Sequence, residues 1–174
     1  ENRMDFSVFT KQETEEMFQT MVERMPEQIK GMAVSEFGSI EEWRKHYLEV
    51  MSSEKMQENY AKVIEWYGSK DAFLEAAGHP VSREVAESFG KRVDSILRKL
   101  MERKNLPRDS FEFKEPVAEY GFVMKMLYQI KDEKPLMQSV AQSYRDPLTQ
   151  KKTDEIYGDG AAEYFAEAIE LFYK

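Results

Sequence analysis

The stretch Tyr157-Gly-Asp-Gly-Ala-Ala-Glu-Tyr-Phe-Ala-Glu-Ala-Ile-Glu-Leu-Phe-Tyr173 has the clearest pattern in the sequence. Gly158 and Gly160 bracket Asp159, and a run of residues suited to a helix follows them. The Asp159 carboxylate can accept hydrogen bonds from the unpaired N–H groups at a helix start, and its charge suits the positive end of the helix. We therefore expect Asp159 to cap a final helix.

Apolar residues of this final segment recur at helical spacing in two stripes. They are Ala162, Phe165, Ala166, Ile169 and Phe172 in the first stripe, and Tyr164, Ala168 and Leu171 in the second. An apolar face this wide indicates that neighbouring segments cover most of the helix circumference. We expect the helix to be the central pillar of the core, with the preceding chain packed around it.

The overall composition is that of a water-soluble globular chain. Of its 174 residues, 41% are hydrophobic and 33% are charged, and no apolar run approaches the roughly 20 residues of a membrane helix. The chain has no cysteine, which excludes disulfides, thiolate metal sites and a cysteine nucleophile, and fits a cytoplasmic location. The net charge of −8 argues against a nucleic-acid backbone being held by this chain itself.

Periodicity and capping signals predict an all-α fold of about eight or nine helices. Thr10 and Glu13 form a capping box before a helix that ends at Pro26, and Ser82 caps a long amphipathic helix. Another helix is expected from about Pro116 to Lys131. No run of alternating apolar and polar residues is long enough to indicate a strand. The apolar face of the helix after Ser82 consists of Val85, Phe89, Val93, Ile96, Leu97 and Leu100.

Breaks in the helical pattern mark one expected boundary. It lies near Phe37-Gly38 or near Ser52-Ser53, and the two serines either break a helix or only interrupt it. We divide the chain into an N-terminal helical part, residues 1–50, and a helical ligand-binding core, residues 51–174. The N-terminal part is expected to be less tightly anchored and mobile.

Residues that carry catalytic or metal chemistry are sparse. His46 follows Glu42 by four residues on one helix face, and His79 precedes Pro80 in a turn, but neither histidine has the further ligands that a metal site needs. The phosphate-binding loop and the Gly-x-Ser-x-Gly motif are absent. We expect no metal, no cofactor and no enzymatic activity, and we name no catalytic residue.

Methionine and aromatic residues are the candidates for a binding pocket. The chain has 11 Met, 11 Phe, 9 Tyr and 2 Trp, and such side chains suit adaptable apolar pockets as well as ordinary cores. Gly121 lies inside an expected helix, which indicates close approach either by a packed neighbour or by a ligand. The predicted ligand-binding residues are Trp66, Tyr67, Tyr120, Met124, Tyr128, Tyr164 and Phe165.

The closing motif Tyr157-Gly-Asp-Gly-Ala-Ala-Glu-Tyr resembles the end of the TipAS-type antibiotic-recognition domain of MerR-family transcriptional regulators. From about Phe37 onward, the order of features is also similar, including Glu42-Trp43 in an early helix and a capped long helix after Pro80-Val-Ser82. The resemblance implies a globin-like helical fold with a cleft for a large hydrophobic or peptide-like antibiotic. Some members of the family capture the ligand through a cysteine, which this chain lacks.

The resemblance leads to one function hypothesis and two alternatives. The hypothesis is an effector-binding domain of a MerR-like regulator that binds a hydrophobic or peptide-like small molecule noncovalently. DNA would be contacted only through a head domain that is not visible in this chain, membranes would not be contacted, and a homodimer is one option for the intact protein. The alternatives are a stand-alone drug-sequestering resistance protein and a helical protein-interaction module.

Overall fold

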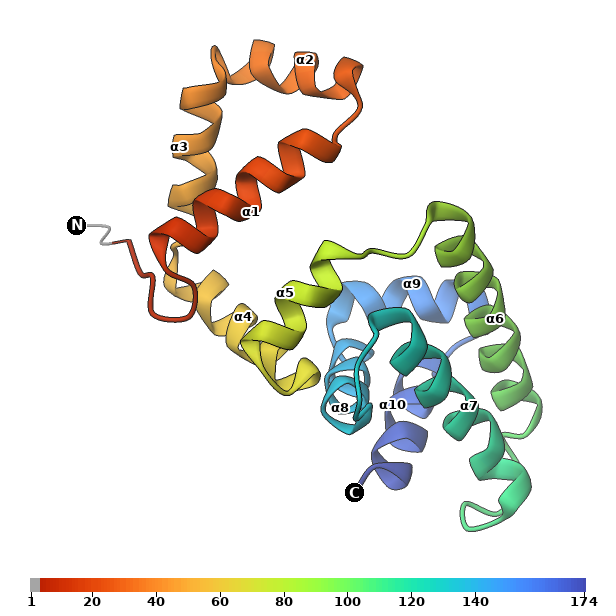
Figure 1. Ribbon diagram of the computed structural model, residues 1–174. Coiled ribbons are helices and arrows are strands. Elements are labelled where there is room, and N and C mark those ends of the chain that lie inside the picture. Colours follow the sequence, from red (N-terminus) through yellow and green to blue (C-terminus); the bar gives the residue numbers. More distant parts are fainter. Residues whose placement is uncertain (1–3) are drawn as a thin grey trace. The chain divides into compact units, whose positions relative to one another are not determined.

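The computed structural model describes residues 4–174, and within them it contains ten helices and no strand (Figure 1). The all-α prediction is confirmed. The expected eight or nine helices were too few, because Ser52 and Ser53 separate two helices and the segment after Asp146 is a helix of its own. No helix of residues 4–174 is long and apolar enough to cross a membrane. The helices are α1 Lys11–Arg24, α2 Glu27–Phe37, α3 Ile40–Met51, α4 Glu54–Tyr67, α5 Lys70–Gly78, α6 Arg83–Glu102, α7 Phe111–Tyr128, α8 Lys134–Ser143, α9 Pro147–Tyr157 and α10 Ala161–Phe172.

The described chain forms two compact units that divide inside α4. The first unit extends to Lys62 and the second begins at Val63. The predicted division after residue 50 lies near the turn between α3 and α4, and the mobility of the N-terminal part stays a prediction. The two units are described separately below.

A small aromatic core holds α1, α2 and α3 of the first unit together. Phe18 and Val22 from α1 and Trp43 from α3 are buried, and the Phe18 and Trp43 rings meet edge to face with centroids 5.2 Å apart. Phe37, at the end of α2, stacks on Trp43 with centroids 6.2 Å apart. All residues of α2 are described, and none of them is buried. The first unit therefore has a thin core.

Hydrogen bonds from polar side chains also stabilise the first unit. The predicted capping box is confirmed: the Glu13 N–H donates to Thr10 Oγ1 at 3.1 Å, and the Thr10 N–H donates to Glu13 Oε1 at 2.9 Å. Gln57, which is buried at the start of α4, accepts from the N–H groups of Val8 and Phe9 and donates to the Met51 carbonyl at 2.8 Å. One amide thus joins the segment before α1 to the turn between α3 and α4.

The second unit is built around α10, as the apolar pattern predicted. Neighbouring helices α6, α7, α8 and α9 pack against it, and Figure 1 shows α10 (blue) among them. Small residues let these helices approach closely, and the larger rings fill the remaining space. The buried residues of α10 are Ala161, Ala162, Tyr164, Phe165, Ala166, Ala168 and Ile169.

The cap of α10 differs from the prediction. Asp159 is exposed, and Gly160 is the N-cap residue, in a left-handed conformation with φ +81°. The carboxylate at the helix start belongs to Asp154 of α9, which accepts from the Gly160 N–H at 3.2 Å and from the Ala162 N–H at 2.9 Å. A carboxylate caps the helix start, as expected. Because the two glycines reverse the chain, this carboxylate comes from a residue earlier in the sequence than the predicted one.

Helix α7 begins five residues before the predicted start at Pro116. Ser110 caps it by accepting from the Phe113 N–H at 3.3 Å. Pro116 lies inside the helix, and its missing N–H leaves the Glu112 carbonyl without its usual intrahelical donor. The Arg103 guanidinium donates to that carbonyl at 2.7 Å, which offsets part of the cost of the proline. The helix ends at Tyr128, three residues before the predicted end.

Gly121 of α7 has a packing role. A Cβ placed on this residue would lie 1.8 Å from the Tyr173 hydroxyl oxygen and 3.0 Å from Tyr173 Cζ. The Tyr173 side chain is buried against α7, and its hydroxyl donates to Glu133 Oε1 at 3.4 Å. The close approach expected at this glycine is therefore made by a packed phenol.

Candidate functional site

The turn between α4 and α5 places Tyr67 over α5. Gly68 has φ +84°, a conformation that favours glycine, and it reverses the chain directly after Tyr67. Ser69 then caps α5 by accepting from the Ala72 N–H at 3.1 Å. The Tyr67 ring meets Phe73 of α5 edge to face, with centroids 5.4 Å apart. The sharp turn thus folds the end of α4 onto α5.

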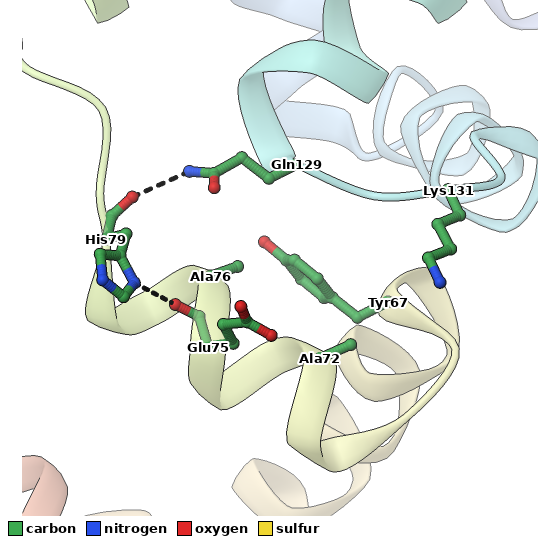
Figure 2. A pocket seen from close by; sticks show the side chains of 7 residues that line it. All are labelled: Tyr67, Ala72, Glu75, Ala76, His79, Gln129 and Lys131. Atoms are coloured by element: carbon green, nitrogen blue, oxygen red, sulfur yellow. Dashed lines mark hydrogen bonds between the residues drawn. The ribbon is translucent and has the colours of Figure 1, made fainter.

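A hollow of ≈ 430 Å³ surrounds Tyr67 between α5 and the segment that follows α7. Figure 2 shows the Tyr67 ring projecting into the space between the α5 side chains and Gln129. Gln129 ends α7 in a left-handed conformation, with φ +57°, and its side-chain amide donates to the His79 carbonyl at 3.0 Å. The residues that line the hollow are Tyr67, Ala72, Glu75, Ala76, His79, Gln129 and Lys131.

A second hollow of ≈ 350 Å³ adjoins the first and shares Tyr67, Ala76 and Gln129 with it. Its other lining residues have apolar or aromatic side chains. They are Phe73, Ala77, Pro80, Val81, Leu127 and Tyr128. We call the two spaces together the Tyr67 hollow. Its first part carries the charged and amide groups, and its second part offers aromatic and aliphatic surface.

Tyr67 and Tyr128 line the hollow, and Trp66 packs against Tyr128. The Trp66 indole meets the Tyr128 ring edge to face with centroids 6.2 Å apart, and Trp66 Nε1 donates to Ser139 Oγ at 3.3 Å. The Tyr67 hydroxyl makes no hydrogen bond to a group of residues 4–174. Burial and the nearby Tyr128 phenol raise the pKa of Tyr67 above the ordinary tyrosine value, so its hydroxyl stays protonated at neutral pH. It can donate to or accept from a bound molecule.

The remaining polar groups come from the end of α5 and from the residues after α7. The Glu75 and Lys131 side chains bring one carboxylate and one ammonium group to the first part of the hollow. His79 contacts the Glu75 carbonyl through Nδ1 at 3.1 Å, and this interaction closes the last turn of α5. The arrangement can orient the polar part of an amphipathic molecule while apolar surface contacts the rest.

Two of the seven predicted ligand-binding residues, Tyr67 and Tyr128, line the hollow. Trp66 contacts the Tyr128 ring but is not among the lining residues. Met124 is half-buried and packs against the core of the second unit, and it is not among the residues that line the two parts of the hollow.

The other three predicted residues are buried in the core of the second unit. Tyr120 shares a hydrogen bond of 2.8 Å with the Tyr144 hydroxyl, and Tyr164 donates to the Leu100 carbonyl at 2.8 Å. Phe165 is fully buried and meets the Tyr144 ring edge to face. Because protein groups already satisfy both hydroxyls, the need for polar partners that suggested a ligand is met within the fold.

The predicted ligand-binding residues include none of the lining residues with charged, imidazole or amide side chains, which are Glu75, His79, Gln129 and Lys131. His79 was interpreted only as a turn residue. Gln129 reaches the hollow because it ends α7 with positive φ, which is uncommon outside glycine and asparagine. The His79-Pro80 turn, which returns the chain from α5, was the one available signal.

The described part of the chain contains no group of three or more His, Asp or Glu side chains that could hold a metal ion. The residues that line the Tyr67 hollow offer aromatic contact and hydrogen-bonding groups. No protein-family model, no curated protein and no solved structure is significantly similar to this chain.

Proposed function

We propose that this chain is the effector-binding domain of a MerR-like transcriptional regulator, and that it binds a hydrophobic or peptide-like small molecule noncovalently in the Tyr67 hollow. The observation that carries the proposal is the Tyr67 ring, which lies between an apolar and a polar compartment with its hydroxyl unengaged by residues 4–174. The closing motif from Tyr157 supplies the regulator part of the proposal through its resemblance to the TipAS-type domain.

The dimensions and chemistry of the hollow suit an amphipathic ligand. Its larger part, at ≈ 430 Å³, lies within the usual range for small-molecule sites. An aromatic or branched portion of the ligand would contact Phe73, Leu127 and Tyr128, and a polar portion would hydrogen-bond to the Tyr67 hydroxyl and the Gln129 amide. Aromatic walls contribute apolar contact area at low conformational cost.

The same hollow offers a way to couple binding to regulation. The Gln129 amide joins the α7 end to the His79 carbonyl just after α5. A ligand that displaces or strengthens this hydrogen bond would favour one arrangement of α5 over another, and such a population shift is how a ligand changes the output of a sensor domain. The DNA-binding head would belong to a part of the protein outside this chain.

A drug-sequestering protein would bind its ligand in the same hollow, but this binding would not change transcription. Binding data alone do not separate sequestration from sensing. The separating measurement is transcription from a reporter promoter by the full-length protein, with and without ligand: a sensor changes the output and a sequestering protein does not.

The test of binding is a thermal-shift screen of the chain against hydrophobic antibiotics, dyes and peptide-like compounds. A ligand at 100 times its dissociation constant adds about 2.7 kcal/mol of stability, which shifts the midpoint by several degrees. In the Tyr67→Phe variant, we expect a smaller shift because one hydrogen bond is lost. Tyr47→Phe is the matched control, since Tyr47 is a half-buried tyrosine of the first unit that does not line the hollow.

Two results would contradict binding at this site. One is the absence of any dose-dependent shift across the whole panel. The other is a shift of equal size in the wild type, in Tyr67→Phe and in Gln129→Ala, which would place the ligand elsewhere. The Gln129→Ala variant also removes the tether to His79, so its midpoint is first compared without ligand.

A further inference from the structure

A groove of ≈ 480 Å³ lies between α1 and α3 of the first unit. Its floor consists of Phe18 and Val22 from α1 and Ile40 from the start of α3. Phe18 and Val22 are nearly covered by their own unit, whereas Ile40 keeps 43% of its surface exposed. The floor is therefore apolar, and one bulky aliphatic side chain is left for another molecule to cover.

Carboxylates dominate the rim of this groove. Glu15, Glu16 and Glu23 from α1 and Glu41 from α3 line it, together with one cation, Arg44. Within residues 4–174, none of these four carboxylates has a cation at ion-pair distance. Glu16 and Glu23 are instead held by glutamine amides, from Gln12 at 3.3 Å and Gln19 at 3.1 Å. With four carboxylates and one guanidinium, the groove is strongly acidic.

The polar residues along α1 follow helical spacing. Gln12, Glu16, Gln19 and Glu23 lie on one face of the helix, and three turns separate the first from the last. At 1.5 Å per residue, this face is roughly 16 Å long. A partner segment of three to four helical turns would match its length.

We propose that the groove binds a helical segment of a protein partner that carries apolar side chains on one face and lysine or arginine on its flanks. The apolar face would cover Ile40, and the basic flanks would pair with the rim carboxylates. An apolar floor with an acidic rim is the complement of such a helix. This proposal stands independently of ligand binding at the Tyr67 hollow, because it involves a different unit and different residues.

The test measures binding of a fluorescein-labelled synthetic helical peptide to the whole chain by fluorescence anisotropy. The peptide has about four turns, with leucine at positions i, i+4 and i+7 and lysine at the flanking positions. A matched peptide carries glutamate in place of every lysine. We expect the basic peptide to bind, the acidic peptide not to bind, and added salt to weaken the complex.

Substitutions inside and outside the groove test where the peptide binds. Glu16→Gln combined with Glu23→Gln should weaken binding about fivefold, because two charge pairs are lost while the glutamine contacts persist. Ile40→Ser should weaken binding about tenfold, because the exposed anchor for the partner is lost. Glu49→Gln combined with Glu58→Gln is the control, since both residues are exposed in the same unit and outside the groove. It changes the net charge equally and should leave binding unchanged.

Three results would overturn the proposal. One is the absence of binding by the basic peptide, and another is equal weakening by the two glutamine double variants, which would mean general attraction to an acidic protein. The third is a monomer–dimer equilibrium, measured by sedimentation, that Glu16→Gln with Glu23→Gln abolishes, because the groove would then belong to a second copy of this chain.

Discussion

The two units of this chain differ in how they use apolar residues. In the second unit, α10 packs against four other helices, and its Tyr164 and Phe165 rings are buried. In the first unit, the buried cluster between α1 and α3 has three residues, α2 buries none of its described side chains, and Met32 keeps 67% of its surface exposed. A deep core gives stability, whereas exposed apolar side chains leave surface for partners.

Polar interactions compensate in part for the thin core of the first unit. The capping box at Thr10 and the buried Gln57 amide satisfy backbone groups that would otherwise lack partners. Small units bury a lower fraction of their surface than large ones, so we expect the first unit to open locally at a lower free energy than the second. The predictions below test this contrast, from the largest expected effect to the smallest.

Truncation of the α10 core should have the largest effect. Phe165→Ala removes a fully buried ring and leaves a cavity, which should lower the free energy of unfolding by about 3–5 kcal/mol. Phe122→Ala is the matched control on α7, because Phe122 is 56% exposed. Denaturant unfolding measures both variants. A loss below about 1 kcal/mol for Phe165→Ala would contradict a central role for α10.

Two glycine substitutions should have opposite signs in the two units. Gly121→Ala forces a Cβ against the Tyr173 phenol and should cost about 1–3 kcal/mol. Gly31→Ala in α2 meets no described atom within 4 Å and should stabilise the first unit by about 0.5–1 kcal/mol, because alanine has the higher helix propensity.

The Tyr173→Leu background tests the cause of the Gly121 effect. The clashing phenol is absent there, so the cost of Gly121→Ala should shrink or change sign. Denaturant unfolding of the single and double variants gives the coupling between the two positions. If the losses of stability in the two single variants simply add up in the double variant, packing of Tyr173 against Gly121 is contradicted.

Alanine substitutions of two aspartates test which carboxylate caps α10. Asp154→Ala removes the acceptor for two N–H groups and should lower the free energy of unfolding by about 0.5–2 kcal/mol. Asp159→Ala changes an exposed residue and should have little effect. Thermal or denaturant unfolding of the two variants decides between the two carboxylates, and a larger loss for Asp159→Ala would contradict the geometry described here.

The smallest expected effect concerns Asp94. Hydrogen bonds from the Tyr157 hydroxyl and from Arg98 lower the pKa of Asp94 below the ordinary aspartate value. A depressed folded pKa contributes stability above the unfolded pKa, and this contribution is lost as the pH falls through the folded pKa. In Tyr157→Phe, NMR titration should show the Asp94 pKa moving up toward its ordinary value. Tyr144→Phe should leave it unchanged, and an unchanged pKa in Tyr157→Phe would refute the role of that hydroxyl.

Local sequence signals predicted most helices because the signals act within a few residues. The capping box at Thr10, the cap at Ser82 and the periodicity of α10 needed no tertiary information. The start of α7 was predicted too late because the expected helix began at about Pro116, whereas this proline lies inside the helix. The Arg103 guanidinium, which donates a hydrogen bond to the carbonyl that this proline leaves without a donor, comes from the residue directly after α6.

The candidate site was harder to predict because it depends on where chain reversals place side chains. Aromatic residues near the end of α4 and the end of α7 were chosen from composition, and Tyr67 and Tyr128 do line the hollow. Tyr164 has the same composition signal but packs in the core, since it lies on the buried face of α10. Gln129 enters the site through a left-handed backbone conformation that no local pattern indicates.

The most direct test of the proposed binding function is hydrogen–deuterium exchange of the whole chain with a compound that raises its melting temperature. We predict that the compound slows exchange in residues 67–81 and 127–131, the two segments that contain the residues lining the Tyr67 hollow. The α1–α3 groove should show no change, because it is a separate site in the other unit. Protection confined to other residues, or no protection at a saturating concentration, would contradict binding in the Tyr67 hollow.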